Sequence, residues 1–262
     1  MSRPLGSVSP EQLRLAYDEL YSQHWLPPRA SLLTWLVRLL EARPGQTLLD
    51  VACGDAQLGR VACQAGLIYY GVDISHVAAW AAHHAGVFVG DGAHLPFADN
   101  RFDYVTSIGS LEHYLDMAQG VHEIARVLKS DGRACVLVPN AFGLTWNVLR
   151  VWRTGDLADD DRQPIQRFGT RSAWHRLLVQ NGLEIRRTLG YERAWPQTVE
   201  EWQMYLTQPR ESVLALLAPF LPLNMRRCFV FLCGKSVPGY SMGQSNSKFQ
   251  SAGSGTSPGS VQ

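Results

Sequence analysis

The sequence lacks a dominant charge of either sign. Its 24 lysines and arginines nearly cancel its 23 aspartates and glutamates, which leaves a formal net charge of +1. A domain that binds nucleic acid or an anionic membrane through its overall charge needs a much larger basic excess. Such partners would need a local basic patch, and we predict neither a nucleic-acid partner nor stable membrane insertion.

Paired cysteines and long uninterrupted apolar runs are also missing. The five cysteines, at positions 53, 63, 135, 228 and 233, are odd in number and have no paired spacing, which favours buried thiols in a reducing compartment. The apolar stretch 213–233 is interrupted by two prolines and two arginines, so it predicts a buried helix and a strand rather than a membrane span. No apolar segment typical of a secretory signal opens the chain, and we therefore expect a cytoplasmic protein.

Short apolar runs alternate with helical patterns from residue 47 onward. We expect strands at 47–51, 68–73, 87–91, 102–108 and 133–138, helices closed by Gly66 and Gly86, a helix from Met117 to Leu128 capped by Asp116, and a turn at 129–132. This alternation is typical of a parallel sheet with helices on both faces. Ligands of such sheets bind at the carboxyl ends of the strands.

The regular alternation of predicted strands and helices ends after Pro139. Two helical insertions are expected at about 141–168 and 197–224, with a helix (171–182) and a strand (183–191) between them and a last strand at 226–234. Residues 1–43 form a predicted helical cap, and 44–236 form the main domain. The segment 237–262 is rich in Gly, Ser and Pro, so we expect a disordered tail.

The stretch "LLDVACGDAQLG" (48–59) is typical of a nucleotide-binding turn between a strand and a helix. A phosphate loop of the Walker type would need lysine where Arg60 stands and a hydroxyl residue where Val61 stands. A dinucleotide site needs three glycines, but Ala52 and Gln57 occupy two of their places. Neither pattern fits.

A third ligand class fits better, namely a nucleoside with a cationic centre and a carboxylate but no phosphate. Asp50, Asp73 and Asp91 follow three successive predicted strands. These acids would suit an ammonium group, two ribose hydroxyls and an adenine amino group respectively, and together they would repel a pyrophosphate. The free N–H groups of the helix that follows would hold a carboxylate.

Residues 47–139 resemble the core of the Rossmann-like S-adenosylmethionine-dependent methyltransferases of the type 11 branch. The resemblance rests on "LDVACGDA", "GVDIS", "GDGAHLPFADNRFDYV" and the stretch 111–140, although alanines 52 and 56 replace the family's usual glycines. It implies a seven-stranded sheet with an antiparallel last strand and S-adenosylmethionine as cofactor. The cofactor site that we predict comprises Asp50, Ala52, Gly54, Asp73, Ile74, Asp91, Gly92, Ser107 and Gly109.

Other residues are candidates for the chemistry and for the acceptor. His113 is a candidate general base, because an imidazole titrates near neutral pH; a histidine that orients a loop or faces solvent is the equal alternative. Tyr17, Tyr21, Trp146 and Trp152 are candidates for the substrate pocket, with core packing as the alternative for each. The histidines at 76, 83 and 84 have no third ligand at a useful spacing, so no metal site is predicted.

These observations predict methyl transfer to a small, apolar or aromatic acceptor, at oxygen. Two alternatives remain open: a macromolecular acceptor, and a cofactor-binding subunit without catalysis. Against a nucleic-acid acceptor, "SIGS" follows the fourth strand, where amino-group enzymes of the family place Asp or Asn before Pro-Pro-Tyr.

Overall fold

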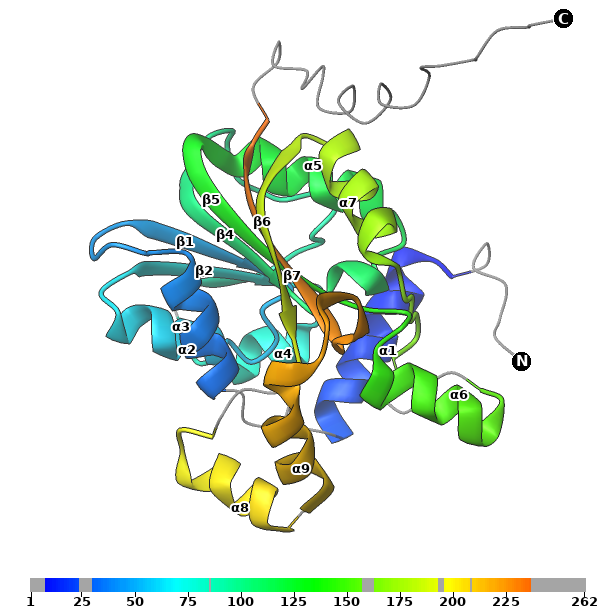
Figure 1. Ribbon diagram of the computed structural model, residues 1–262. Helices are drawn as coiled ribbons and strands as arrows, with labels where there is room; N and C mark the ends of the chain where they lie inside the picture. Colours follow the sequence, from blue (N-terminus) through cyan, green and yellow to red (C-terminus); the bar gives the residue numbers. More distant parts are fainter. Residues whose placement is uncertain are drawn as a thin grey trace, which may run out of the picture.

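The computed structural model describes residues 8–23, 30–84, 86–156, 163–192, 196–207 and 209–236. Within these ranges a single seven-stranded sheet has the order β3-β2-β1-β4-β5-β7-β6 (Figure 1). The strands are β1 (Thr47–Val51), β2 (Ile68–Asp73), β3 (Val87–Val89), β4 (Phe102–Ile108), β5 (Leu128–Pro139), β6 (Leu183–Tyr191) and β7 (Cys228–Lys235).

β7 is antiparallel to both of its neighbours, and the other described pairings are parallel. The predicted fold class, with its antiparallel last strand, is therefore confirmed. The tail that we predict at 237–262 lies outside the described residues.

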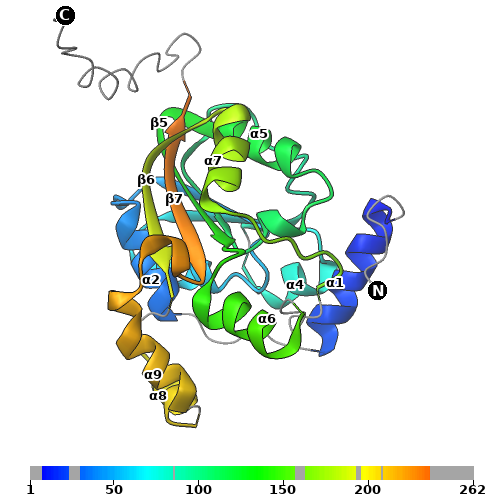
Figure 2. The same cartoon turned by 45° about the vertical axis from the view of Figure 1, so that its right-hand side comes forward.

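The α-helices lie on both faces of the sheet and beyond one end of it (Figures 1 and 2). They are α1 (Pro10–Gln23), α2 (Ala30–Leu39), α3 (Gln57–Gln64), α4 (His76–Ala81), α5 (Met117–Val127), α6 (Leu149–Thr154), α7 (Arg171–Gln180), α8 (Val199–Thr207) and α9 (Pro209–Leu217). In Figures 1 and 2, α2 and α3 lie on one face and α5 and α7 on the other. Each pair buries its apolar stripe in a separate core cluster, one around Leu36 and Leu58 and one around Ile124 and Leu178.

Two local predictions were wrong. The helix after β2 ends at Ala81 rather than at Gly86, and His83 turns the chain with a φ of 47°. The turn expected at 129–132 belongs to β5, where the pairing shifts from Phe102–Leu128 to Tyr104–Arg133. The extra residues are accommodated as a bulge, which bends a strand without ending it.

Both insertions leave the sheet at one edge. Pro139, Cys228 and Tyr191 lie side by side in the sheet, because Cys228 pairs with each of the other two. The first insertion begins as a π-helix (Leu144–Val148) and continues as α6, and the second contains α8 and α9. The carboxyl ends of the parallel strands lie at this same edge, so the insertions stand beside the place where a ligand is expected.

Replacement of Leu178 by alanine should destabilise the protein strongly. The side chain is fully buried between α7 and the sheet, and Leu→Ala at such sites costs about 2–5 kcal/mol of the free energy of unfolding. Val179, the next residue, is 44% exposed, so Val179→Ala is the matched control and should cost less than about 0.5 kcal/mol. Urea unfolding measures both, and equal losses would contradict this packing of α7.

Candidate cofactor and acceptor site

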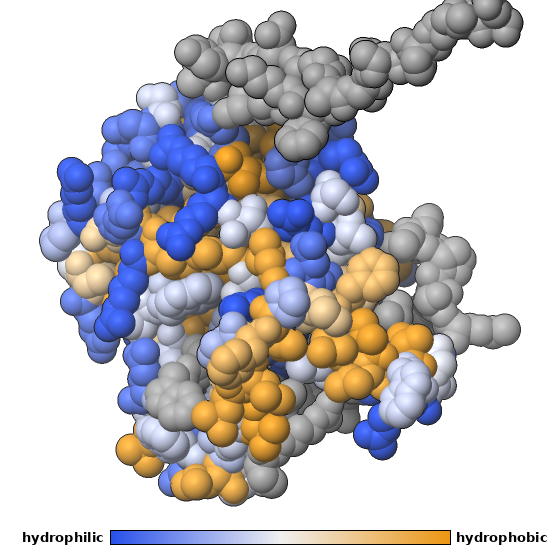
Figure 3. Space-filling model, in the orientation of Figure 1, coloured by the Kyte–Doolittle hydropathy of each residue, from blue (hydrophilic) through white to orange (hydrophobic). Residues whose placement is uncertain are grey.

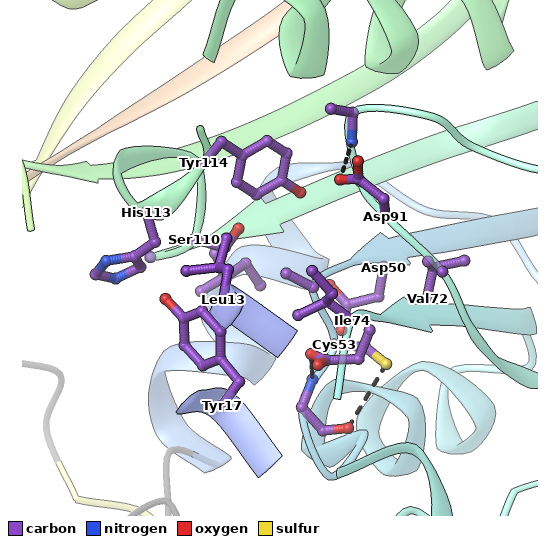
Figure 4. A pocket seen from close by; sticks show the side chains of 18 of the residues that line it. Leu13, Tyr17, Asp50, Cys53, Val72, Ile74, Asp91, Ser110, His113 and Tyr114 are labelled. Carbon is purple, nitrogen blue, oxygen red and sulfur yellow. Dashed lines mark hydrogen bonds between the residues drawn. The ribbon is translucent and has the colours of Figure 1, made fainter. Parts of the chain in front are cut away.

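A cavity of about 270 Å³ lies at the carboxyl ends of β1, β2 and β4. The loops after these strands form its floor, and α1 covers it with Leu13, Tyr17 and Tyr21 (Figure 4). The predicted site residues that line it are Tyr17, Tyr21, Asp50, Ala52, Gly54, Asp73, Ile74, Asp91, Gly92, Gly109 and His113.

Three predicted residues are not among those that line this cavity in the described part of the chain. Ser107 is fully buried in β4, and its hydroxyl lies 2.9 Å from that of Ser110, which does line the cavity. Trp146 packs edge-to-face against Phe168, and Trp152 is 81% exposed. The structure therefore places Ser107 behind the site and both tryptophans outside it.

Asp73 ties two loops of the cavity together. Its Oδ2 accepts a hydrogen bond from the Gly54 amide at 2.8 Å, and its Oδ1 accepts one from the Ser75 amide at 2.9 Å. Burial raises the pKa of this carboxyl to about 6, although the two amide bonds oppose the shift. A carboxylate oxygen can accept more than one hydrogen bond, so both oxygens keep capacity for hydroxyl groups of a ligand.

Asp50 lies near the end of β1 and is as buried as Asp73. The Thr106 hydroxyl donates to its Oδ1 at 2.7 Å, and the Tyr69 hydroxyl donates to its Oδ2 at 3.2 Å. Burial raises the pKa of Asp50 to about 7, against the effect of these two bonds and with a further rise from the charge of Asp73. A cationic group bound nearby would favour the ionised form of Asp50.

The loop between β1 and α3 has an unusual backbone. Ala52, Gly54 and Ala56 all have positive φ, at 59°, 57° and 57°. L-residues rarely adopt this conformation, whereas glycine does so freely. The two alanines that differ from the family's usual glycines thus keep the conformation that glycine would take.

Two buried polar atoms of the cavity wall have no hydrogen-bond partner within the described residues. They are Oδ1 of Asp55 and the hydroxyl of Tyr114. A buried polar group without a partner costs free energy, so such atoms indicate a ligand. Tyr114 packs so closely on Gly92 and Gly120 that a Cβ at Gly92 would overlap its hydroxyl oxygen and a Cβ at Gly120 would lie 2.5 Å from its ring. Sequence reasoning missed Tyr114, since nothing local marks it.

His113 is 8% exposed and is held by the segment 163–169, which crosses the cavity edge. Its Nδ1 lies within hydrogen-bond distance of the Ile165 carbonyl oxygen, which can only accept. Nδ1 therefore carries the proton in the neutral ring, and Nε2 keeps a lone pair. Nε2 lies 3.8 Å from Oε1 of Glu112. Figure 4 shows His113 and Tyr17 on one side of the cavity and Asp91 on the other.

Arg167 fixes the loop that carries His113. Its guanidinium donates to the carbonyl oxygens of Glu112 and Tyr114, one residue on either side of His113. Burial lowers the pKa of Arg167 from its usual value. The first insertion thus contributes backbone and charge to the site, from residues more than fifty positions away along the chain.

Comparison with known proteins agrees with this geometry. Residues 49–136 match the model of the type 11 methyltransferase family, described as "Methyltransferase domain". Residues 49–136 thus carry a methyltransferase domain of this family. The predicted resemblance is confirmed, and S-adenosylmethionine is the cofactor of this class.

Two relatives and one solved structure give the extent of the likeness. A demethylmenaquinone methyltransferase of Corynebacterium kroppenstedtii is 38% identical over 99 residues, which cover 37% of this chain and 43% of that protein. A 2-phytyl-1,4-naphtoquinone methyltransferase of Trichormus variabilis is 33% identical over 109 residues, covering 37% and 48%. The chain thus matches less than half the length of these relatives. Phosphoethanolamine N-methyltransferase 2 of Haemonchus contortus, solved with S-adenosyl-L-methionine, shares the fold with a TM-score of 0.57, 17% identity, and coverage of 87% of this chain and 58% of that one.

Removal of the Asp73 carboxylate should weaken cofactor binding. Loss of a charged hydrogen-bond acceptor leaves its donors unpaired, and we expect Asp73→Ala to lose at least about 1.5–3 kcal/mol of binding free energy. Titration calorimetry with S-adenosylmethionine measures this. Asp103 is the matched control, because its carboxylate also holds a backbone amide, that of Thr47, but at the opposite edge of the sheet. Asp103→Ala should lower the melting temperature and leave the affinity unchanged; equal affinity in folded Asp73→Ala would refute the assignment.

Cofactor affinity should fall as the pH falls below 7. Binding next to a cation requires ionised Asp50 and Asp73, whose pKa values in the free protein are about 7 and about 6. We expect a loss of about tenfold or more between pH 8 and pH 5.5, because protonation then competes with binding. In Asp50→Asn this dependence should shrink, and an unchanged pH profile would contradict the role of Asp50.

The same shifts predict the stability of the free protein. Both folded pKa values exceed the unfolded value of about 3.9, so the native state binds more protons than the unfolded one between pH 4 and 7. These two groups therefore stabilise the fold fully below pH 4 and lose that contribution as the pH rises through 6 and 7. Thermal denaturation without cofactor should show this contribution as a difference between the parent protein and Asp50→Asn in how the melting temperature changes with pH.

Proposed function

We propose that this chain transfers the methyl group of S-adenosylmethionine to a small apolar acceptor. The observation that carries the proposal is one cavity that joins three acidic strand ends to a histidine with an oriented ring. Asp50, Asp73 and Asp91 suit the cationic and nucleoside parts of the cofactor, and His113 stands at the other end. A cofactor-binding subunit without catalysis would have no use for a histidine held in this way.

The residues present fit the cofactor. Asp73 offers its two oxygens to the ribose hydroxyls, Asp91 suits the adenine amino group, and the deeply buried Asp50 suits the ammonium group. The Oδ1 of Asp55 and the hydroxyl of Tyr114, which have no hydrogen-bond partner within the described residues, add a further acceptor and a donor in the wall. The bound cofactor supplies an electrophilic methyl group on a sulfonium.

The protein contributes mainly by positioning. Methyl transfer is an in-line displacement, and holding two reactants in line is worth about 7–11 kcal/mol of the barrier. α1 closes the cavity with apolar side chains, which excludes water from the reacting atoms. Its Asp18 accepts hydrogen bonds from the Ser75 hydroxyl at 2.7 Å and the Val77 amide at 3.2 Å, so α1 is fastened next to Asp73.

His113 is placed to take a proton from the acceptor. Because Nδ1 donates to Ile165, Nε2 is the atom that can accept a proton. The imidazolium that results would be stabilised by Glu112, whose Oε1 lies 3.8 Å away. The segment 163–169 keeps the ring in this orientation while the acceptor enters.

The acceptor that we propose is an apolar or aromatic molecule methylated at oxygen. The apolar side chains of α1 support an apolar acceptor, and the relatives above are named for quinones. Those names favour a second candidate, a ring carbon of a quinol-like acceptor. Either acceptor atom becomes a good nucleophile when a hydroxyl loses its proton, so both need the same base. The mass of the product after hydrolytic removal of O-methyl groups would distinguish them.

We also propose a cytoplasmic location, because the state of the cysteines is compatible with a reducing compartment. The five cysteines are all free in the structure, and four of them are buried. No described helix has the length and apolar composition that a membrane span requires.

His113→Ala should lower turnover about 10²–10⁴-fold, the range for general bases, with cofactor affinity nearly intact. His122→Ala, on the exposed side of α5, is the control and should behave as the parent. Turnover is measured as release of S-adenosylhomocysteine with a panel of hydroxylated naphthoquinones and phenols. Normal turnover in His113→Ala would leave positioning alone as the mechanism, and loss of cofactor binding would make His113 part of the cofactor loop.

A further inference from the structure

The two insertions present large apolar side chains to solvent. On α6, Trp152 is 81% exposed and Leu149 is 40% exposed; on α9 and just beyond it, Val213, Leu216, Leu217 and Phe220 are each at least half exposed. The last four follow the spacing of a single helical stripe. We call these six residues the apolar face. Figure 3 shows apolar residues gathered over α9 and toward α6 on one side of the molecule. Single exposed apolar residues are ordinary, but a group of this size marks an interaction site.

The apolar face lies at the same edge of the sheet as the cavity. α6 follows the carboxyl end of β5, and α9 leads into β7, whose first residue Cys228 pairs with Pro139 at that end. Figures 1 and 2 both show α6, α8 and α9 projecting from one end of the sheet. Trp146 connects this region to the site, since it packs on Phe168 of the segment that holds His113.

The chain that carries the apolar face is basic. Residues 141–154 and 209–227, which include the whole of α9, contain five arginines, one glutamate (Glu211) and no Asp or Lys. The Arg227 guanidinium lies 3.8 Å from the centre of the Trp146 ring, which places a cation between the two insertions. The exposed acids Asp156 and Glu200 lie outside both segments. Arginine beside exposed tryptophan, phenylalanine and leucine is the composition that binds the surface of an anionic bilayer.

We propose that the apolar face docks on an anionic lipid bilayer. Trp152 and Phe220 enter the level of the headgroups, where tryptophan is favoured, and Arg153, the exposed arginine of α6, lies against lipid phosphates. A second copy on this face would bring together two surfaces that each carry an excess of arginine, which is unfavourable. The inference rests on the proposed function in one respect: an apolar acceptor would pass from the lipid to a cavity at the same edge.

The test uses the full chain with unilamellar vesicles, either pure phosphatidylcholine or the same lipid with 30% phosphatidylglycerol. We expect binding in sedimentation to the anionic vesicles, weaker binding at 0.5 M salt, and little binding to the neutral ones. The double variant Trp152→Ser, Phe220→Ser should lower the partition coefficient about tenfold or more, because it removes two inserted side chains. Both residues are exposed, so its melting temperature should equal that of the parent.

Trp80→Ser is the matched control. Trp80 is 78% exposed on α4, which begins next to Asp73 and runs away from the carboxyl edge of the sheet. This variant should bind the vesicles as the parent does. Equal loss in Trp80→Ser and in the double variant would overturn the docking face, since any exposed tryptophan would then suffice.

Three other results would overturn the proposal. They are absence of binding to anionic vesicles, a concentration-dependent dimer that the double variant abolishes, and a protein partner that competes with the vesicles for this face. Failure of the proposed function looks different: the protein would bind vesicles as expected yet methylate no apolar acceptor. Conversely, turnover of a detergent-solubilised acceptor without vesicle binding would leave the proposed function standing and remove the docking face.

Discussion

The site depends on the two hydrogen bonds that the buried carboxylate of Asp73 accepts. One fixes the loop after β1 through Gly54, and the other fixes the loop after β2 through Ser75. The hydroxyl of the same Ser75 donates to Asp18, which fastens α1 over the cavity. A single acidic side chain at a strand end therefore sets the relative positions of the floor and the cover. Burial strengthens these hydrogen bonds and also raises the pKa of the Asp73 carboxyl. The same carboxyl therefore holds the two loops together and is the candidate to bind a ligand.

The other side of the site is organised by the first insertion. The loop after β4 has little helical structure of its own, since a single short 3-10 turn covers Leu111–His113. Its shape comes from Arg167, which binds two of its carbonyl oxygens, and from Ile165, which binds the His113 ring. The cofactor half of the cavity thus lies at the strand ends of the sheet, whereas the half that contains the candidate base depends on the segment 163–169, which follows the fifth strand. The family match at residues 49–136 includes His113 and ends before this segment.

Local patterns predicted the fold well, because strands and helices follow from apolar runs and their spacing. β1, β2, β4 and β6 have the bounds expected from the sequence. The acids at strand ends were found for the same reason, since a parallel sheet brings all its carboxyl ends to one edge. Contacts between distant segments left no local signal. Tyr114 and Arg167 were missed on this account, and Trp152 was expected in a pocket although its helix buries none of its residues.

The loop after β1 shows how tertiary contacts override a local preference. The sequence places alanine at positions 52 and 56, and a β-carbon in the left-handed conformation costs roughly 1–2 kcal/mol at each. The loop adopts that conformation nevertheless, because the alternatives would break the Asp73–Gly54 bond and the turn from Ala56 back to Cys53. Ala56 is also 3% exposed against the core beneath α3, where a small apolar side chain contributes packing that glycine would not. The departure from glycine is thus a balance between backbone strain and burial, and the position of the Asp73 carboxylate keeps the loop in the shape that a nucleoside needs.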